Sequence, residues 1–215
     1  MAEYKLHCFA QSGHSYKAAL MLALCEADWE PVFVDFFKGE GRSDAFRKIN
    51  PMGECPVLVH GDLTLTQSGV MLDYLSKQFD RFGPKTEEEH REILRWVLFE
   101  NHKLNSFQGI YRFMRNWAPE QARSEDVNRF FKGRSLGAMK VLDEHLAGRE
   151  WIAADRATIA DVACSGYLFY PREEFGWNDT ERFENIEAWM DRMKALPGWK
   201  HPYDLMPGHP MPGSA

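Results

Sequence analysis

The 215-residue sequence has no long apolar run: a membrane-spanning helix needs about 18 consecutive apolar residues, and no such run is present. A signal peptide begins with basic residues followed by an apolar run, and the start of this sequence, residues 1–5, lacks this pattern. We therefore expect neither a membrane span nor a secretory leader.

Cysteine is sparse, with four residues at Cys8, Cys25, Cys55 and Cys164. They form no Cys-x-x-Cys pair and no Cys/His ligand spacing, so we expect no metal site and no disulfide framework. Scattered cysteines in a chain of this size suit a reducing compartment. We expect the protein in the cytoplasm, with each cysteine a small buried hydrophobe rather than a nucleophile.

Positive charge is not in excess, since 26 Lys and Arg residues against 32 Asp and Glu residues give a net charge of −6. Nucleic acid and anionic membranes attract basic proteins, so we expect neither as a partner. The 44% of hydrophobic residues exclude a disordered or low-complexity polymer and are enough for a substantial core.

The first part of the chain, residues 1–80, alternates strand and helix signals. Its first two predicted strands flank a helix rich in Ala, Leu and Met, which predicts a βαβ unit with parallel strands. The Gly61-Asp62 pair predicts a hairpin turn between the last two strands. The expected strands are 4–9, 29–35, 56–59 and 63–65, and the expected helices are 16–27, 43–48 and 69–77.

A linker at 81–86 separates this part from a second one, 87–215, that lacks strand alternation. Apolar residues there recur at helical spacing and predict helices at 87–114, 124–146, 158–170 and 186–196. The Pro- and Gly-rich tail from about Pro202 predicts no regular element and a surface position. The sequence predicts a small α/β domain followed by an all-helical domain.

Two features of the first part point to a ligand. Pro56 opens a strand, and a cis bond before it would leave the Cys55 backbone free to pair with an extended ligand. An ordinary trans proline fits the same position. Gln67 and Ser68 begin a helix, where free N–H groups favour an anion and the Gln67 amide can bind an amino-acid head group. A plain helix cap is the alternative.

A third feature, Ser12-Gly13-His14-Ser15, joins the first strand to the first helix. A hydroxyl at a helix N-terminus can donate to a thiolate and lower its pKa, and Ser12, His14 and Ser15 all compete for this role. A cap with a surface histidine is the alternative. A fourth feature, Thr158 followed by Asp161, is an acidic capping box, which we interpret as structural rather than catalytic.

Together these features resemble the glutathione transferase family over nearly the whole chain. The most specific part is 51–75, in which a proline-led strand, a hairpin and an amide-then-Ser helix start follow in unbroken order. The capping box at 158–161 is the second part. The resemblance implies a thioredoxin-like N-terminal domain and a helical C-terminal domain. It also implies glutathione as co-substrate, no metal and a homodimer.

The resemblance also implies roles for single residues. Pro56 corresponds to the family's cis-proline, and the Cys55 backbone would hold the cysteinyl part of glutathione. Gln67 and Ser68 would hold the γ-glutamyl carboxylate and amine. Ser12 falls where the serine-type bacterial classes keep the hydroxyl that stabilises the thiolate. The chain lacks the tyrosine or cysteine that other classes carry there, although Cys8 lies nearby.

Two positions depart from the family pattern. Glu54 stands where a residue compatible with the glycine carboxylate is usual, and it would repel that group unless it points away. Lys38 is our candidate for restoring the positive charge. Gln67 replaces a glutamate common in the family, which removes one charge facing the substrate amine.

We therefore expect a glutathione S-transferase that attacks a small hydrophobic electrophile held by the helical domain. Glutathione-dependent disulfide or peroxide reduction, and a non-catalytic transferase-like binding module, are the alternatives. Four aromatic residues and a methionine at roughly helical spacing could form the second site, and core or dimer packing explains them equally well. They are Phe107, Tyr111, Phe113, Met114 and Trp117.

Overall fold

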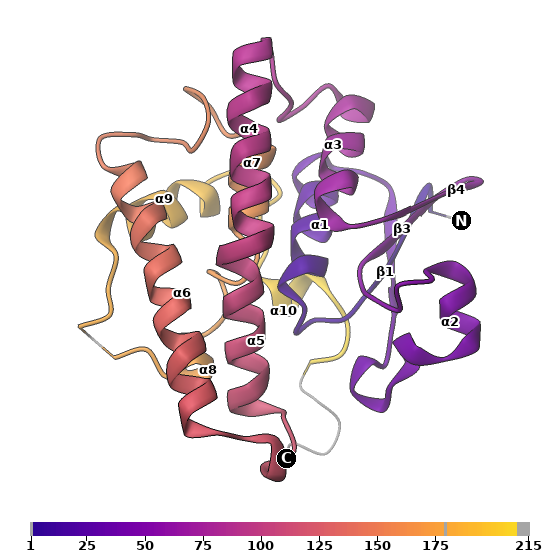
Figure 1. Cartoon of the computed structure of the whole chain (residues 1–215). Coiled ribbons are helices and arrows are strands. Elements are labelled where there is room, and N and C mark those ends of the chain that lie inside the picture. The colour runs from indigo at the N-terminus through magenta and orange to yellow at the C-terminus, as the bar shows by residue number, and fades with distance from the viewer. Residues whose placement is uncertain (1, 179, 210–215) are drawn as a thin grey trace. The chain divides into compact units, whose positions relative to one another are not determined.

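The computed structural model describes residues 2–178 and 180–209, which form two compact units (Figure 1). The first unit holds the described residues up to Gly83 together with 196–209, and the second holds residues 84–195. The first is an α/β unit with a thioredoxin-like arrangement, and the second is helical. The predicted fold class is confirmed.

The first unit is built on a four-stranded mixed sheet in the order β2-β1-β3-β4. Strand β1 pairs in parallel with β2, as the predicted βαβ unit requires, and antiparallel with β3, which pairs antiparallel with β4. The strands are β1 (Tyr4–Cys8), β2 (Trp29–Phe33), β3 (Val57–His60) and β4 (Leu63–Thr66).

Helices cover both faces of this sheet. Figure 1 shows α1 (Gly13–Leu24) and α3 (Ser68–Phe79) on one face and α2 (Asp44–Ile49) on the other. The side chains of β1 alternate between the two: the ring of Tyr4 meets Phe79 of α3 at 5.7 Å, and the ring of His7 meets Phe46 of α2 at 6.3 Å. Apolar side chains of β1, α1, β3 and α3 form the core between the sheet and the first helix pair.

The end of the chain differs from the expected domain boundary. The sequence predicts a helical domain over 87–215, but 196–209 belong to the first unit. The Gln11 side chain donates to the carbonyl of Gly208 at 2.8 Å, and the Tyr16 hydroxyl donates to that of Lys200 at 3.0 Å. The prediction of no regular element from Pro202 is wrong for one turn, α10 (Pro202–Leu205), because proline suits the first position of a helix. Residues 210–215 of the predicted tail lie outside the described residues.

The second unit consists of helices joined by turns. Helix α5 packs against α6 and α8, α4 against α7, and α6 against α9. In the described stretches, no helix combines the length and the apolar character that crossing a membrane requires. The helices are α4 (Glu87–Phe99), α5 (Asn105–Asn116), α6 (Glu125–Leu146), α7 (Ile159–Cys164), α8 (Arg172–Phe175) and α9 (Glu184–Lys194).

Two predicted helices have different ends in the structure. The helix expected over 87–114 is interrupted by a π-helical turn at Glu100–Leu104 and continues to Asn116. The helix expected over 158–170 stops at Cys164. Gly166 lies two residues further on, and a Cβ there would meet the Asn105 side chain at 2.6 Å, so a larger residue would displace that side chain. Residues 165–170, whose apolar side chains suggested a helix, form turns instead.

Candidate functional site

The segment leading into β3 carries the first candidate feature. The Cys55–Pro56 peptide bond is cis, so of the two forms that the sequence left open, the cis form is the one present. Cys55 is partly buried against a small cluster of Val34, Phe46 and Val57. The backbone of Cys55 therefore lies beside a fixed apolar support just ahead of the strand.

The start of α3 carries the second feature. Gln67 precedes the helix with φ +67° and ψ 114°, a backbone conformation that a residue with a side chain rarely adopts. Its side chain makes no capping hydrogen bond, so the plain-cap interpretation fails for Gln67. The N–H groups of Val70 and Met71 both donate to the Gln67 carbonyl, at 3.0 and 3.2 Å. Ser68 is buried in the first turn, where backbone N–H groups lack intrahelical acceptors.

The Gln67 amide faces the loop that contains Glu54. Its Nε2 atom lies 3.2 Å from the Glu54 carboxylate and 3.3 Å from the sulfur of Met52. Asn50 fixes this loop, because its buried side chain donates to the Glu54 carbonyl at 2.8 Å and accepts from the Met52 N–H at 3.1 Å. Sequence reasoning missed Asn50, since an asparagine before Pro51 signals only a turn.

Lys38 lies at the end of a short 3₁₀ turn, Phe36–Lys38, after β2. Its ammonium is 3.0 Å from the Asp35 carboxylate, and the side chain is 77% exposed. No contact among the described residues joins it to Glu54 or Gln67. A second cation lies beside the Glu54 loop: the Nε of Arg47 is 3.8 Å from the place that a Cβ on Gly53 would occupy.

Ser12 caps the N-terminus of α1. Its Oγ accepts a hydrogen bond from the Ser15 N–H at 3.1 Å, which leaves its own O–H as a donor. The loop before it is fixed from the chain's other end, because the Ala10 N–H donates to the Pro207 carbonyl at 2.8 Å. Ser12 therefore presents a hydroxyl donor at the positive end of a twelve-residue helix.

The competitors of Ser12 have different surroundings. Burial lowers the pKa of His14 to about 3, so its imidazole is neutral at pH 7. Burial raises the pKa of Cys8 to about 12, so this thiol stays protonated. Ser15 is fully buried, and its Oγ has no hydrogen-bond partner among the described residues.

The aromatic residues expected at a second site do not share one surface of α5. Tyr111 is buried and donates from its hydroxyl to the Phe175 carbonyl at 2.8 Å. Phe107 is half-buried and lies 6.3 Å, between ring centres, from Phe131 of α6. Phe113 is 37% exposed. Met114 and Trp117 are half-buried like Phe107, so Phe113 is the most exposed of the set.

Asp161 is structural, as its capping-box position predicted. Its fully buried carboxylate accepts from the Thr158 N–H at 2.8 Å and the Thr158 hydroxyl at 3.1 Å. It also accepts from the Ile152 N–H at 3.0 Å and the Trp189 indole at 2.9 Å. Elsewhere in the described part of the chain, no three His, Cys, Asp or Glu side chains gather closely enough to hold a metal ion.

Comparisons with known proteins match both units. A family model described as "Glutathione S-transferase, N-terminal domain" matches residues 3–77, and one described as "Glutathione S-transferase, C-terminal domain" matches residues 119–197. A solved structure of a possible glutathione S-transferase from Rhodopseudomonas palustris is 31% identical with a TM-score of 0.86, over 96% of this chain and 100% of that one.

Two further relatives agree. The solved glutathione S-transferase from Pseudomonas fluorescens is 28% identical with a TM-score of 0.86, over 94% of this chain and 100% of that one. The curated glutathione S-transferase F14 of Arabidopsis thaliana is 27% identical over 98% of this chain and 89% of its own length. The matches therefore extend through both units.

Proposed function

Since the chain belongs to the glutathione S-transferase family, we propose that it activates the thiol of glutathione for attack on a small hydrophobic electrophile. Ser12 is the residue that stabilises the thiolate, as in the serine-type classes. The sulfur forms a bond to an electrophilic carbon of the second substrate, and the leaving group departs from that carbon with the bonding electrons.

The observation that carries this proposal is the hydrogen bond from the Ser15 N–H to the Ser12 Oγ. This bond fixes the Ser12 oxygen and does not use its proton, which the hydroxyl can donate to a thiolate. A free thiol has a pKa of about 8.5, and lowering it by about two units needs roughly 2.7 kcal/mol. A hydrogen bond to a charged group supplies about 1.5–3 kcal/mol, and the helix terminus adds about 0.3–1 kcal/mol.

The remaining contacts to glutathione follow from the loop before β3 and the start of α3. We assign the cysteinyl backbone to that of Cys55, beside the cis Pro56. We assign the γ-glutamyl carboxylate to Ser68 and the open N–H groups of α3, where the helix dipole favours an anion. The γ-glutamyl amine goes to Gln67, with the Glu54 carboxylate 3.2 Å from that amide as its counter-charge.

The glycine carboxylate needs a cation on the other side of the loop. Lys38 remains our candidate, and its charge is shared with Asp35 at 3.0 Å. Arg47, beside Gly53, is a second cation for the same carboxylate. We propose that Lys38 and Arg47 share the binding of the glycine carboxylate, which lies at an exposed end of glutathione.

For the electrophile we propose the helical unit, with Phe113 as the exposed aromatic contact. Phe107 and Tyr111 then support the helix from its packed side, Tyr111 through its bond to the Phe175 carbonyl. The identity of the electrophile depends on the shape of the pocket rather than on these residue types.

We also propose a cytoplasmic homodimer. All four cysteines are free thiols, which suits a reducing compartment. Each unit exposes large apolar side chains that a second copy would cover, including Leu98 of α4 at 61% and Val70 of α3 at 52% exposure. Replacing Leu98 by Glu should shift the mass measured by sedimentation toward that of one chain.

Turnover measurements on variants of the α1 start test the thiolate proposal. Ser12→Ala should lower turnover with a standard aryl halide at least about tenfold and leave glutathione affinity within about twofold, since one charge-assisted hydrogen bond is lost. Ser12→Thr, which keeps the cap and the hydroxyl, should retain most activity, and Cys8→Ala should match the unaltered protein. Unchanged turnover in Ser12→Ala would contradict the proposal. A panel with peroxides and mixed disulfides separates transfer from reduction, and inactivity on the whole panel indicates a binding module.

A further inference from the structure

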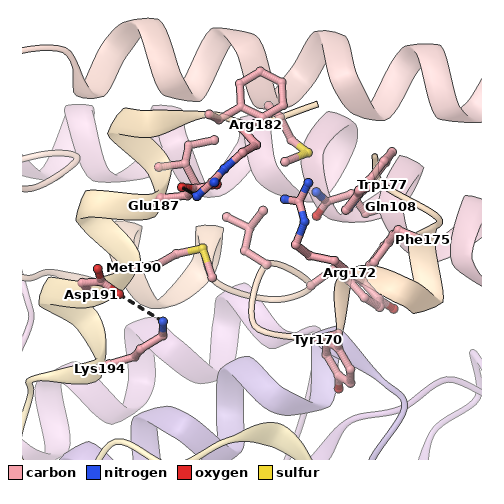
Figure 2. A pocket seen from close by; sticks show the side chains of 15 residues that line it. Gln108, Tyr170, Arg172, Phe175, Trp177, Arg182, Glu187, Met190, Asp191 and Lys194 are labelled. Carbon is pink, nitrogen blue, oxygen red and sulfur yellow. Dashed lines mark hydrogen bonds and ion pairs between the residues drawn. The ribbon is translucent and has the colours of Figure 1, made fainter. Parts of the chain in front are cut away.

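A cavity of about 360 Å³ lies within the helical unit, and Figure 2 shows the side chains around it. Its walls come from α5, α6, α8 and α9 and from residues 167–170, 177 and 182–183. The volume falls within the range of about 300–1,000 Å³ that is typical of small-molecule sites. Every lining residue belongs to this unit, so the cavity is complete without the first one.

Gln108 of α5 lines this cavity with an unsatisfied amide. The residue is 1% exposed, and its Oε1 atom has no hydrogen-bond partner among the described residues. Buried amides are nearly always paired, because removing one from water without a partner costs stability. A ligand that donates a hydrogen bond in the cavity would satisfy Gln108.

Arg172 supplies a positive charge at the same cavity, and this charge acts on the nearby carboxylates of Glu181 and Glu187. Its guanidinium donates to the carbonyls of Asn178 at 2.9 Å and Glu181 at 3.3 Å, but it makes no ion pair with any described Asp or Glu. In Figure 2 the guanidinium of Arg172 and the amide of Gln108 point toward the same part of the cavity.

The other two cations of the cavity wall are already neutralised. Arg182 is paired with Glu187, and the Lys194 ammonium lies 3.1 Å from the Asp191 carboxylate. The lining side chains therefore carry three positive charges, on Arg172, Arg182 and Lys194, against two negative ones, and this excess favours an anionic ligand.

Flat aromatic surfaces complete the cavity wall. The rings of Phe175 and Trp177 are stacked, with centres 5.2 Å apart and planes 4° from parallel. Tyr170 also lines the cavity. Aromatic rings bind other planar rings through stacked or edge contacts.

We propose that this cavity binds a planar aromatic carboxylate that carries an N–H or O–H donor beside the carboxylate. The carboxylate pairs with Arg172, the neighbouring donor bonds to the Oε1 of Gln108, and the ring lies against Tyr170, Phe175 and Trp177. The site goes beyond the proposed transferase reaction and uses none of the residues assigned to glutathione.

Three probes test the site on the unaltered protein by calorimetric titration. Indole-2-carboxylate has the N–H beside the carboxylate, benzothiophene-2-carboxylate replaces that N–H by sulfur, and indole lacks the carboxylate. We expect indole-2-carboxylate to bind with a dissociation constant on the order of 0.1 mM, about five- to tenfold tighter than benzothiophene-2-carboxylate. Indole should bind at least about tenfold more weakly. Saturating glutathione should not displace the probe.

Two variants assign the contacts. Gln108→Leu should abolish the preference for the N–H, and Arg172→Gln should abolish the preference for the carboxylate, while neither alters transferase turnover. Arg91→Gln, an exposed arginine of α4, is the matched control. Equal binding of the two carboxylates by the unaltered protein, absence of binding at millimolar concentration, or displacement by glutathione would each overturn the proposal. None of these outcomes bears on Ser12.

Discussion

The side-chain amide of Gln67 donates a hydrogen bond to the carboxylate of Glu54 at 3.2 Å. The two residues that depart from the family pattern are therefore a pair. We propose that Glu54 supplies, across the loop, the negative charge missing at position 67. Its carboxylate is turned toward Gln67 at the start of α3, and we propose that this orientation relieves the repulsion expected between Glu54 and the glycine carboxylate.

This pairing predicts the effect of removing the charge. Glu54→Gln should raise the dissociation constant for glutathione about five- to twentyfold, because the substrate amine loses its counter-charge. Isothermal titration measures the change. Glu54→Gln combined with Gln67→Glu moves the carboxylate to position 67 and should recover most of the affinity. If Glu54 instead repelled the glycine carboxylate, Glu54→Gln would bind glutathione more tightly than the unaltered protein.

The Asp161 carboxylate predicts a stability effect in the helical unit. Asp161→Asn should lower the free energy of unfolding by about 2–4 kcal/mol. The amide N–H of the new side chain would face N–H or O–H groups that now donate to a carboxylate oxygen. Chemical denaturation measures this loss. Asp155→Asn is the matched control, because that carboxylate is 95% exposed, and it should cost less than about 0.5 kcal/mol. A loss equal to that of the control would contradict the structural role.

The pair of Glu89 and Arg156 predicts a dependence of stability on pH. Arg156 donates two hydrogen bonds to the Glu89 carboxylate, at 2.9 and 2.7 Å, and these, together with one from the Lys85 N–H, lower the pKa of Glu89 from 4.5 to about 2. A carboxyl group whose pKa is lower in the folded protein stabilises the fold fully at pH values above its unfolded-state pKa. This stabilisation is lost as the pH falls toward the folded-state pKa. The pair is near the surface, so its contribution is about 0.5–1 kcal/mol.

Arg156→Gln should therefore lower the free energy of unfolding by a constant amount above pH 4.5, with the difference from the unaltered protein shrinking between pH 4.5 and 2. Denaturation at a series of pH values measures it, and Arg91→Gln serves as the control on α4. A difference that grew toward acid pH would contradict this assignment.

The buried thiols predict slow alkylation of the native protein. Burial raises the pKa of Cys8 and of Cys55 to about 12 and that of Cys25 to about 11, so few thiolates exist at pH 8. Iodoacetamide should label these positions much more slowly in the native protein than in urea, as measured by mass spectrometry. Fast labelling of Cys8 in the native protein would instead indicate a reactive thiolate, and Cys8 would again be a candidate for the role assigned to Ser12.

Most of the first unit was predictable from local sequence. Gly61 and Asp62 mark the hairpin, Ser12 caps α1, and the alternating residues of β1 predict a strand. These signals lie within a few residues of the element that they specify. The return of residues 196–209 to the first unit was not predictable, because its contacts join Gln11 to Gly208 across 197 positions.

The candidate site shows the same limit. The residues of the β3 and α3 starts were identifiable from their order along the chain, but the bond between Gln67 and Glu54 was not, because it depends on the loop that Asn50 holds. The aromatic residues of α5 differ in burial, which their spacing did not reveal. Helical spacing does not tell a core-facing ring such as Tyr111 from an exposed one such as Phe113.

Proton release on glutathione binding tests the central claim most directly. Titration calorimetry at pH 7 in two buffers of different ionisation enthalpy gives the number of protons released. We predict that reduced glutathione releases most of one proton and that S-methylglutathione binds without release, because only the free thiol can ionise beside Ser12. Binding of reduced glutathione with no proton release, or no binding of either compound, would contradict the account.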